Sequence, residues 1–169
     1  MRIAKLETPV GTLTLVAADA GLRAVLFPGE ASPEGAVEGA HPLPASAERQ
    51  LQEYFAGERR TFELPLDPVG TPFQRRCWLA LSSIPYGTTI SYGEQARRLE
   101  HPRAARAVGA ANARNPIPIV FPCHRVVGVN GALTGYGGGL DAKRILLDHE
   151  TRVLHRTRLT THCGRGLRR

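Results

Sequence analysis

The stretch Ile119-Val120-Phe121-Pro122-Cys123-His124-Arg125-Val126-Val127 places a thiol, an imidazole and a guanidinium in succession. Adjacent side chains of a regular strand point to opposite faces, so Cys123 and His124 cannot face each other in one. Pro122 favours a bend here, so that the side chains of Cys123 and His124 could be linked through a turn or through one bound water. This arrangement is typical of a thiol activated by a neighbouring base. The residues alone leave open a buried structural cysteine beside a hydrogen-bonded histidine.

The length and the cysteines of the chain limit its class. The 169 residues are enough for one domain or two small ones with a core of their own. Three cysteines, Cys77, Cys123 and Cys163, lie far apart without a C-x-x-C pair. This spacing argues against a zinc site or a disulfide framework and for a reducing, intracellular setting. Since no apolar stretch is long enough to span a bilayer, we expect a cytoplasmic protein.

The net charge of +7 is unevenly distributed along the chain. Residues 1–70 contain six Lys and Arg against ten Asp and Glu, whereas residues 71–169 contain 16 basic and five acidic residues. The basic part also holds the Cys-His stretch. Its charge favours a phosphate-bearing partner such as nucleic acid, with an anionic membrane or simple solubility as the alternatives.

The first part of the sequence predicts a small α/β unit. Three β runs separated by turn residues predict an antiparallel meander over residues 3–6, 13–18 and 22–27. A Pro- and Gly-rich loop follows over residues 28–44, and then a helix that Ser46 caps and Gly57 ends. Residues 61–66 are expected to return as a strand. Nothing in this part indicates a catalytic group.

The part that follows residues 67–70 predicts helices. Thr71 and Gln74 fit a capping box with Pro72 at the first helical position, so a helix should run to about residue 82 with Cys77 in the core. A second capping box at Ser91 predicts a short helix to about residue 99. The next helix is expected over residues 101–113. Two short helices joined by a turn outline a helix-turn-helix, although many helical proteins contain such a pair without binding DNA.

The second helix of this pair consists mainly of Ala and Gly, with few Arg. A helix that reads base edges in the major groove usually exposes several Gln, Asn, Arg or Lys. This helix fits a narrow groove, into which it would insert one Arg, and it would bind DNA through the shape of the groove and the phosphates. An Ala-rich helix buried against its neighbours is equally consistent with the composition.

Glycines follow the Cys-His stretch, and a helix and a basic segment end the chain. The glycines give close backbone approach to a flat ligand, or a flexible surface loop. Residues 141–150 predict the last helix, with Glu150 near its end. Residues 153–169 carry several Arg and no acid, and we expect a disordered basic tail in which Cys163 is incidental.

A set of specific motifs occurs within residues 71–150: Arg106-Ala107-Val108-Gly109, Asn115-Pro116, Pro118-Ile119, Pro122 to Val127, Gly135-Tyr136, Gly138-Gly139, Lys143, Leu146-Leu147 and Glu150. In these motifs, residues 71–150 closely resemble the O6-alkylguanine-DNA alkyltransferases, whereas residues 1–70 resemble them only in general layout. Tyr86-Gly87 and Ser91-Tyr92-Gly93 also match the approach to the DNA-binding helices. One departure is Gly137, where some members carry Ser.

The resemblance implies a role for each matching residue. Cys123 would accept the alkyl group as a permanent thioether, His124 would act as its base through a water, and Glu150 would orient His124. Asn115 would brace the turn that holds them. Tyr92 would help rotate the nucleotide and protonate the leaving guanine, and Arg106 would fill the space left in the stack. Further expected DNA contacts are Arg103, Ala105 and Gly109, and the expected base pocket is Pro118, Val126, Tyr136, Gly137, Gly138 and Lys143.

The resemblance also implies the fold, the domains and the reaction. We expect an α+β protein: a structural α/β domain over residues 1–69 with an antiparallel sheet, and a mainly helical domain over residues 70–152 with a helix-turn-helix. The reaction would be direct-reversal DNA repair, one irreversible alkyl transfer per molecule, with minor-groove binding and base flipping. Whether O4-alkylthymine is a second substrate is left open by the sequence. Double-stranded DNA is the expected partner of a monomer that needs no metal, cofactor or membrane.

Three other functions are consistent with parts of the sequence. One is a lesion binder without transfer, as in the alkyltransferase-like proteins, although these lack the cysteine. Another is a cysteine hydrolase that uses Cys123, His124 and Glu150 with turnover. The third is a helix-turn-helix regulator that selects an operator.

Overall fold

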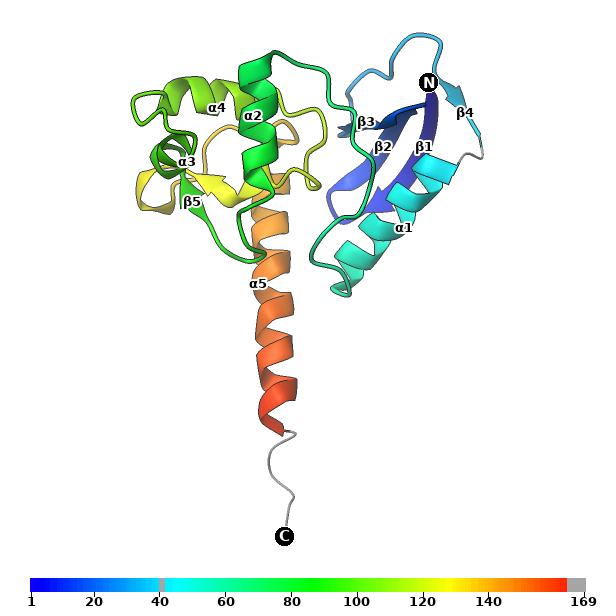
Figure 1. The fold of residues 1–169 in the computed structure, drawn as a ribbon. Helices are drawn as coiled ribbons and strands as arrows, with labels where there is room; N and C mark the ends of the chain where they lie inside the picture. The colour runs from blue at the N-terminus through cyan, green and yellow to red at the C-terminus, as the bar shows by residue number, and fades with distance from the viewer. Residues whose placement is uncertain (40–41, 164–169) are drawn as a thin grey trace.

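The computed structural model describes residues 1–39 and 42–163, which form a sheet-containing half and a helical half (Figure 1). In the first half, strands β1 (Arg2–Thr8), β2 (Gly11–Ala18), β3 (Gly21–Leu26) and β4 (Val37–Glu38) precede helix α1 (Pro42–Ala56). In the second half, the elements are α2 (Pro72–Leu81), β5 (Ile90–Ser91), α3 (Tyr92–Arg98), α4 (Ala105–Ala113), the 3-10 turn η1 (Cys123–Arg125), β6 (Val126–Val127), the turn η2 (Val129–Gly131) and α5 (Gly139–Cys163). The expected α+β class is confirmed.

The sheet of the first half has the order β3-β2-β1-β4. β1 pairs antiparallel with β2, and β2 pairs antiparallel with β3, so the predicted meander is confirmed. β4 adds a short parallel edge beside β1, within the segment expected to be a loop. Alternate apolar residues of β2, such as Leu13 and Leu15, are fully buried because one face of the sheet packs on the core.

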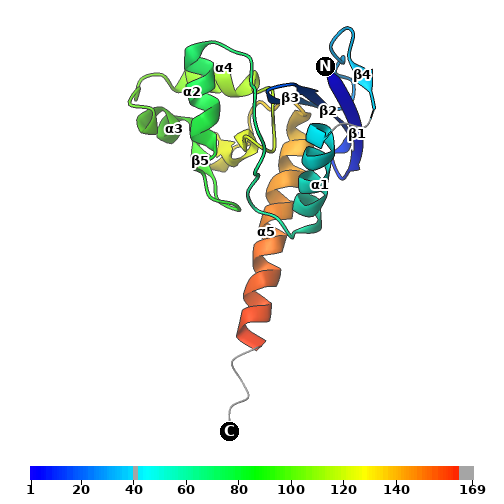
Figure 2. The same ribbon diagram turned by 45° about the vertical axis from the view of Figure 1, so that its right-hand side comes forward.

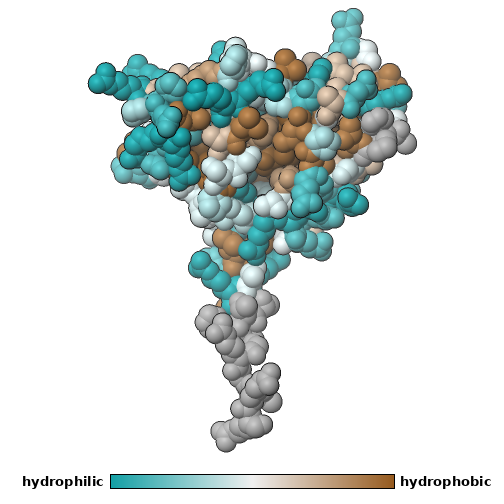
Figure 3. All heavy atoms as spheres, viewed as in Figure 1, coloured by the Kyte–Doolittle hydropathy of each residue, from teal (hydrophilic) through white to brown (hydrophobic). Residues whose placement is uncertain are grey.

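One hydrophobic cluster spans both halves of the chain. It contains Leu13 and Leu51 of the first half together with Trp78, Phe121 and Leu146 of the second. Helix α1 lies beside α5, as Figure 2 shows, and the His149 ring bonds the Tyr54 carbonyl over 2.8 Å. On the surface, hydrophobic residues gather in the middle of the body, where the two halves meet (Figure 3). The halves therefore share a core.

Helices α3 and α4 pack on α2 through a smaller apolar cluster. Thr71 accepts from the Gln74 amide while the Gln74 side chain accepts from the Thr71 amide, which confirms the predicted capping box with Pro at the helix start. Ser91 caps α3 by accepting from the Glu94 amide. Cys77 is buried, as expected of a core residue.

Two predicted helix starts and one predicted strand were wrong. Helix α1 begins at Pro42, so Ser46 lies inside it, because proline suits the first turn. Helix α4 begins at Ala105, since Ala104 closes a turn onto the His101 carbonyl. The expected strand over residues 61–66 is reduced to one bridge between Leu22 and Leu66.

The prediction of a disordered tail from residue 153 was also wrong over residues 153–163. Helix α5 continues through Glu150 to Cys163, and its last part extends away from the body in both ribbon views. Between residues 140 and 163 the sequence contains no Gly or Pro to end the helix. Residues 164–169 of the expected tail lie outside the described part of the chain.

Candidate active site

The thiol of Cys123 begins the 3-10 turn η1 and is 7% exposed. This irregular backbone after Pro122 agrees with the expected bend. Asn115 Nδ2 donates to the Cys123 sulfur over 3.1 Å and to the Phe121 carbonyl over 2.8 Å. Burial raises the pKa of Cys123 to about 11, and the Asn115 hydrogen bond and the Lys143 charge offset only part of this. The resting thiol is therefore protonated at neutral pH.

The backbone that leads to Cys123 has an uncommon conformation. Ile119 has a φ of +74°, which costs a β-branched residue free energy on the order of 1–3 kcal/mol. Ile119 is almost fully buried in the shared cluster, and the Asn115 side chain also accepts from the Ile117 amide. Core packing and these bonds therefore hold the turn that presents the thiol.

His124 follows in η1, is fully buried and bonds Glu150 of α5. Its Nε2 lies 2.8 Å from Glu150 Oε1, while its Nδ1 is buried without a hydrogen-bond partner among the described residues. Burial lowers the pKa of His124, although Glu150 acts in the opposite direction. The imidazole is therefore neutral at rest.

Glu150 accepts hydrogen bonds from three further groups. Arg125 donates through Nε and Nη2 at 2.9–3.2 Å, the Gly87 amide donates to Oε2 over 2.8 Å, and the Tyr54 hydroxyl donates to Oε1 over 2.9 Å. Burial raises the pKa of Glu150, but the hydrogen bonds and charges of His124 and Arg125 more than offset it and leave a pKa of about 2. Glu150 is an anion at neutral pH.

These protonation states assign the hydrogen on the imidazole. An ionised carboxylate only accepts, so the His124 Nε2 that faces Glu150 carries the hydrogen. The buried Nδ1 then presents a lone pair. The site thus combines a protonated thiol with a neutral base whose hydrogen-bonded partner stabilises the imidazolium that forms when it takes a proton.

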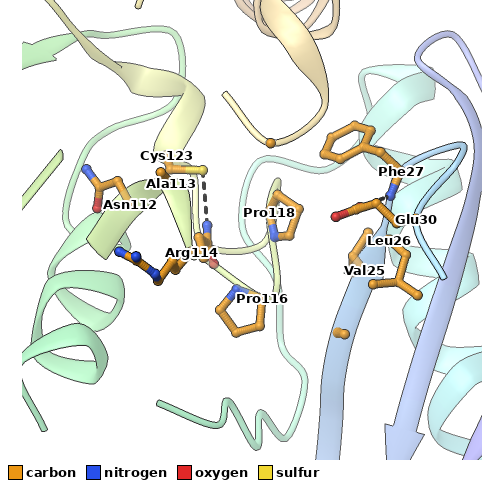
Figure 4. A pocket seen from close by; sticks show the side chains of 13 residues that line it. Val25, Leu26, Phe27, Glu30, Asn112, Ala113, Arg114, Pro116, Pro118 and Cys123 are labelled. Carbon is orange, nitrogen blue, oxygen red and sulfur yellow. Dashed lines mark hydrogen bonds between the residues drawn. The ribbon is translucent and has the colours of Figure 1, made fainter. Parts of the chain in front are cut away.

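A cavity of about 220 Å³ opens beside the thiol, between the two halves. Figure 4 shows Cys123, Asn112 and Arg114 on one side, and Val25, Leu26, Phe27 and Glu30 of the first half on the other. Pro116 and Pro118 lie between these walls, and Gly137 is also part of the lining. The Val25 amide also donates to the Pro116 carbonyl over 2.9 Å. Residues of the first half thus form one wall of the cavity.

The glycine-rich loop closes over the same region. Tyr136 meets the Phe27 ring edge-on with 5.5 Å between centroids, and a Cβ added at Gly138 would lie 2.6 Å from that ring. Lys143, fully buried, donates to the carbonyls of Val126 and Thr134 over 2.6 and 2.9 Å. Burial lowers the pKa of Lys143, against the attraction of Cys123.

A shallow groove of about 400 Å³ lies on the outer side of α3 and α4. Its lining is Tyr92, Ala105, Arg106, Gly109, Ala113, Thr134 and Gly135. Arg106 is exposed, and Gly109 lies beside the Tyr92 ring, which a Cβ added there would meet at 3.6 Å in ordinary van der Waals contact. The structure thus brings together four of the expected DNA contacts, whereas Arg103 precedes α4 and does not line the groove.

The sequence did not point to several residues of the site. Arg125 was noted only as a neighbour of His124, and Tyr54, Phe27 and Val25 belong to the part in which no catalytic group was expected. No local signal in the sequence marks Tyr54, which lies 96 positions from Glu150. For Arg125, its place beside a buried Cys-His pair is a signal, because a buried guanidinium requires an anion.

The described residues contain neither a cluster of metal ligands nor a membrane-spanning helix. In residues 1–39 and 42–163, no three His, Cys, Asp or Glu side chains gather as a metal site. No helix within the same ranges has the length and apolar character needed to cross a membrane.

Comparison with known proteins identifies the family. Residues 1–68 match the model of the 6-O-methylguanine DNA methyltransferase ribonuclease-like domain, and residues 72–152 match the model of its DNA binding domain. A methylated-DNA–protein-cysteine methyltransferase of Methanosarcina acetivorans is 48% identical over 154 residues, which cover 89% of this chain and 98% of the relative. The protein of that name from Mycolicibacterium paratuberculosis is 52% identical over 149 residues, covering 86% and 90%.

A solved structure agrees with these relatives. The crystal structure of Mycobacterium tuberculosis OGT in complex with DNA superposes with a TM-score of 0.85 at 44% identity, covering 90% of this chain and 94% of that one. The family models together match most of the chain. The protein therefore belongs to the 6-O-methylguanine DNA methyltransferase family.

Proposed function

We propose that this protein repairs DNA by moving a methyl or small alkyl group from O6 of guanine to the sulfur of Cys123. The observation that carries the proposal is the thiol at a cavity wall, next in sequence to a neutral His124 whose Nε2 bonds the Glu150 anion at 2.8 Å. An alkyl carbon on oxygen requires a soft nucleophile, and thiolate is the softest that side chains offer. Family membership supports DNA as the partner.

In the proposed reaction, the thiol proton passes through a water to His124 Nδ1. The sulfur then attacks the alkyl carbon, so that a C–S bond forms as the C–O6 bond breaks. The purine takes a proton, for which the Tyr92 hydroxyl is the proposed donor, and leaves as guanine. The proton held by His124 then returns through solvent to Tyr92. Because the alkyl carbon of a neutral thioether is a poor electrophile, the group stays on the sulfur and the protein acts once. No co-reactant is needed to balance the atoms.

Access to the guanine requires that the nucleotide leave the duplex, at a cost of a few kcal/mol. We place the DNA over the groove of α3 and α4, with Ala105 and Gly109 allowing close approach and Arg103 binding phosphate. Arg106 would occupy the space left in the stack. The extruded base would lie among Pro118, Tyr136 and the Gly137-Gly138 backbone, with the Val126 carbonyl and Lys143 nearby. The protein would act as a monomer in the cytoplasm.

Mass spectrometry of one tryptic peptide tests the transfer. The protein is incubated with a duplex that contains one O6-methylguanine and is then digested; cleavage at Arg114 and Arg125 isolates residues 115–125 with Cys123 as its only cysteine. We expect this peptide to gain the mass of one methylene group, with at most one transfer per chain. The peptide that contains Cys77 is the internal control and should stay unchanged.

Two of the alternative functions give different results in this assay. Binding to the lesion without a mass gain would point to a lesion binder. Product formation beyond one equivalent would point to a hydrolase. A Cys123→Ser variant should bind the duplex but show no transfer, whereas Cys77→Ala should transfer normally.

A further inference from the structure

Tyr54 connects the first half of the chain to the candidate relay. It lies on α1, is fully buried, and donates its hydroxyl hydrogen to Glu150 Oε1 over 2.9 Å. None of the roles implied by the family resemblance falls on residues 1–70. Yet this hydroxyl bonds the same carboxylate oxygen as His124 Nε2. The hydrogen bond therefore joins the first half to the group that orients the base.

The donors around Glu150 differ in what they restrain. Arg125 reaches both oxygens, so its guanidinium can remain bonded while the carboxylate turns. The Gly87 amide bonds only Oε2, and Tyr54 bonds only Oε1. Each thus holds one oxygen, from opposite parts of the chain. Together they fix the rotation of the carboxylate, and with it the direction from which His124 is held.

Tyr54 is itself held in place. Its ring packs edge-on against Phe55 and Tyr86, with centroid distances of 5.2 and 5.9 Å, and its carbonyl bonds the His149 ring. Burial, followed by the nearby Glu150 charge, raises the pKa of Tyr54 well above 10. The hydroxyl therefore remains protonated and cannot itself act as a base near neutral pH.

We propose that Tyr54 is a positioning residue for alkyl transfer, and that its hydroxyl holds Glu150 Oε1 in the orientation that keeps His124 aligned with the thiol. The proposal rests on the transfer function proposed above. Under this proposal, the first half of the chain contributes to alkyl transfer in two ways: it forms one wall of the cavity, and it positions Glu150 through Tyr54. The hydroxyl also shares the negative charge of Oε1, and so limits how strongly Glu150 attracts a proton onto His124.

Two tyrosines of one aromatic cluster provide a matched test. Tyr54→Phe removes a hydroxyl that bonds Glu150, whereas Tyr86→Phe removes a buried hydroxyl that has no hydrogen-bond partner among the described residues. Single-turnover transfer from an O6-methylguanine duplex is measured against protein concentration and pH. For Tyr54→Phe we expect the maximal rate constant to fall roughly five- to twentyfold, with half-saturation unchanged, because only alignment is lost.

The pH profile separates positioning from packing. Without the Tyr54 hydrogen, Oε1 becomes more basic and the His124 pKa rises, so the acid limb of the rate profile should move to higher pH. Tyr86→Phe should leave both the rate constant and the limb unchanged. The proposal would be refuted if Tyr54→Phe kept the wild-type rate constant and the wild-type acid limb. It would also be refuted if both variants lost the same fraction of the rate constant, in proportion to the fall in their melting temperatures.

A third protein avoids the risk that Tyr54→Phe misfolds. 3-Fluorotyrosine at position 54 keeps the ring and the hydroxyl but makes the phenol a stronger donor. The acid limb should then move to lower pH, opposite to Tyr54→Phe, and an unmoved limb would contradict the proposal. Failure of the wild type to gain the methyl group in the same assay would instead reject the transfer function itself.

Discussion

Asn115 and Cys123 share one hydrogen bond, in which the amide Nδ2 lies 3.1 Å from the sulfur. The same amide nitrogen bonds the Phe121 carbonyl, so a single side chain holds the turn and stabilises the thiolate. Since burial has already raised the pKa of Cys123 to about 11, this donor opposes a large desolvation cost. Its removal should weaken the nucleophile directly.

We therefore expect Asn115→Ala to slow methyl transfer about tenfold or more, because a hydrogen bond to a charged group contributes about 1.5–3 kcal/mol. The pKa of Cys123 should rise further. Labelling with iodoacetamide as a function of pH measures the thiolate, and labelling in denaturing urea is the control, where variant and wild type should react alike. Unchanged labelling of the folded variant would show that Asn115 acts only on the backbone.

Acid should destabilise the protein in two stages. The pKa of His124 is lowered in the fold, so the unfolded chain binds its proton first and stability falls as the pH drops below about 6.5. Glu150 has a folded pKa of about 2, below its ordinary value of 4.5, so its contribution is present above pH 4.5 and is lost as the pH falls towards 2. The second loss amounts to about 3 kcal/mol.

Urea unfolding at a series of pH values measures both stages. Glu150→Gln should be less stable at pH 7 and should lack the loss below pH 4.5. Glu94→Gln is the control, since Glu94 forms ion pairs with Arg97 and Arg98 at the surface and should change the acid dependence little. Parallel curves for wild type and Glu150→Gln would contradict the assignment.

Adjacent glycines of the pocket loop should respond differently to alanine. A Cβ at Gly138 would lie 2.6 Å from the Phe27 ring, whereas one at Gly137 would meet no atom within 4 Å. We expect Gly138→Ala to lower the free energy of unfolding by about 1–3 kcal/mol through overpacking. Gly137→Ala should stay within about 0.5 kcal/mol of wild type. Urea midpoints compare them, and equal midpoints would show that Phe27 moves aside.

The role proposed for Arg106 predicts a difference between duplex and free base. Arg106→Ala should slow transfer from a duplex roughly 10- to 100-fold, because the extruded state loses the group that fills the stack. Transfer from free O6-methylguanine should change less than twofold. Arg49→Ala, which removes an exposed charge on α1, is the control. An equal loss with both substrates would place Arg106 in the chemistry instead.

Local sequence patterns predicted the elements whose causes are local. Thr71, Pro72 and Gln74 carry all the information for the start of α2, and the turn residues separate β1, β2 and β3. The resemblance implies one site for Cys123, His124 and Glu150. In the structure, His124 Nε2 lies 2.8 Å from Glu150 Oε1.

The missed features depend on long-range packing. Tyr54 reaches Glu150 only because α1 lies beside α5, and Phe27 meets Gly138 only because β3 ends at the pocket loop. Neither contact leaves a periodic pattern in the sequence. The helical course of residues 151–163 could have been predicted from the sequence, because no Gly or Pro occurs between Glu150 and Cys163.

The hydrophobic cluster common to both halves affects how the protein is made on the ribosome. Tyr54 is synthesised early, Cys123 much later, and Glu150 later still, while the cluster that contains Tyr54 and Cys123 draws on residues from Leu6 to Leu146. A growing chain therefore carries its thiol before it has the anion that orients the base. The sulfur becomes a competent acceptor only after translation has passed Glu150 and the nascent polypeptide has closed around it.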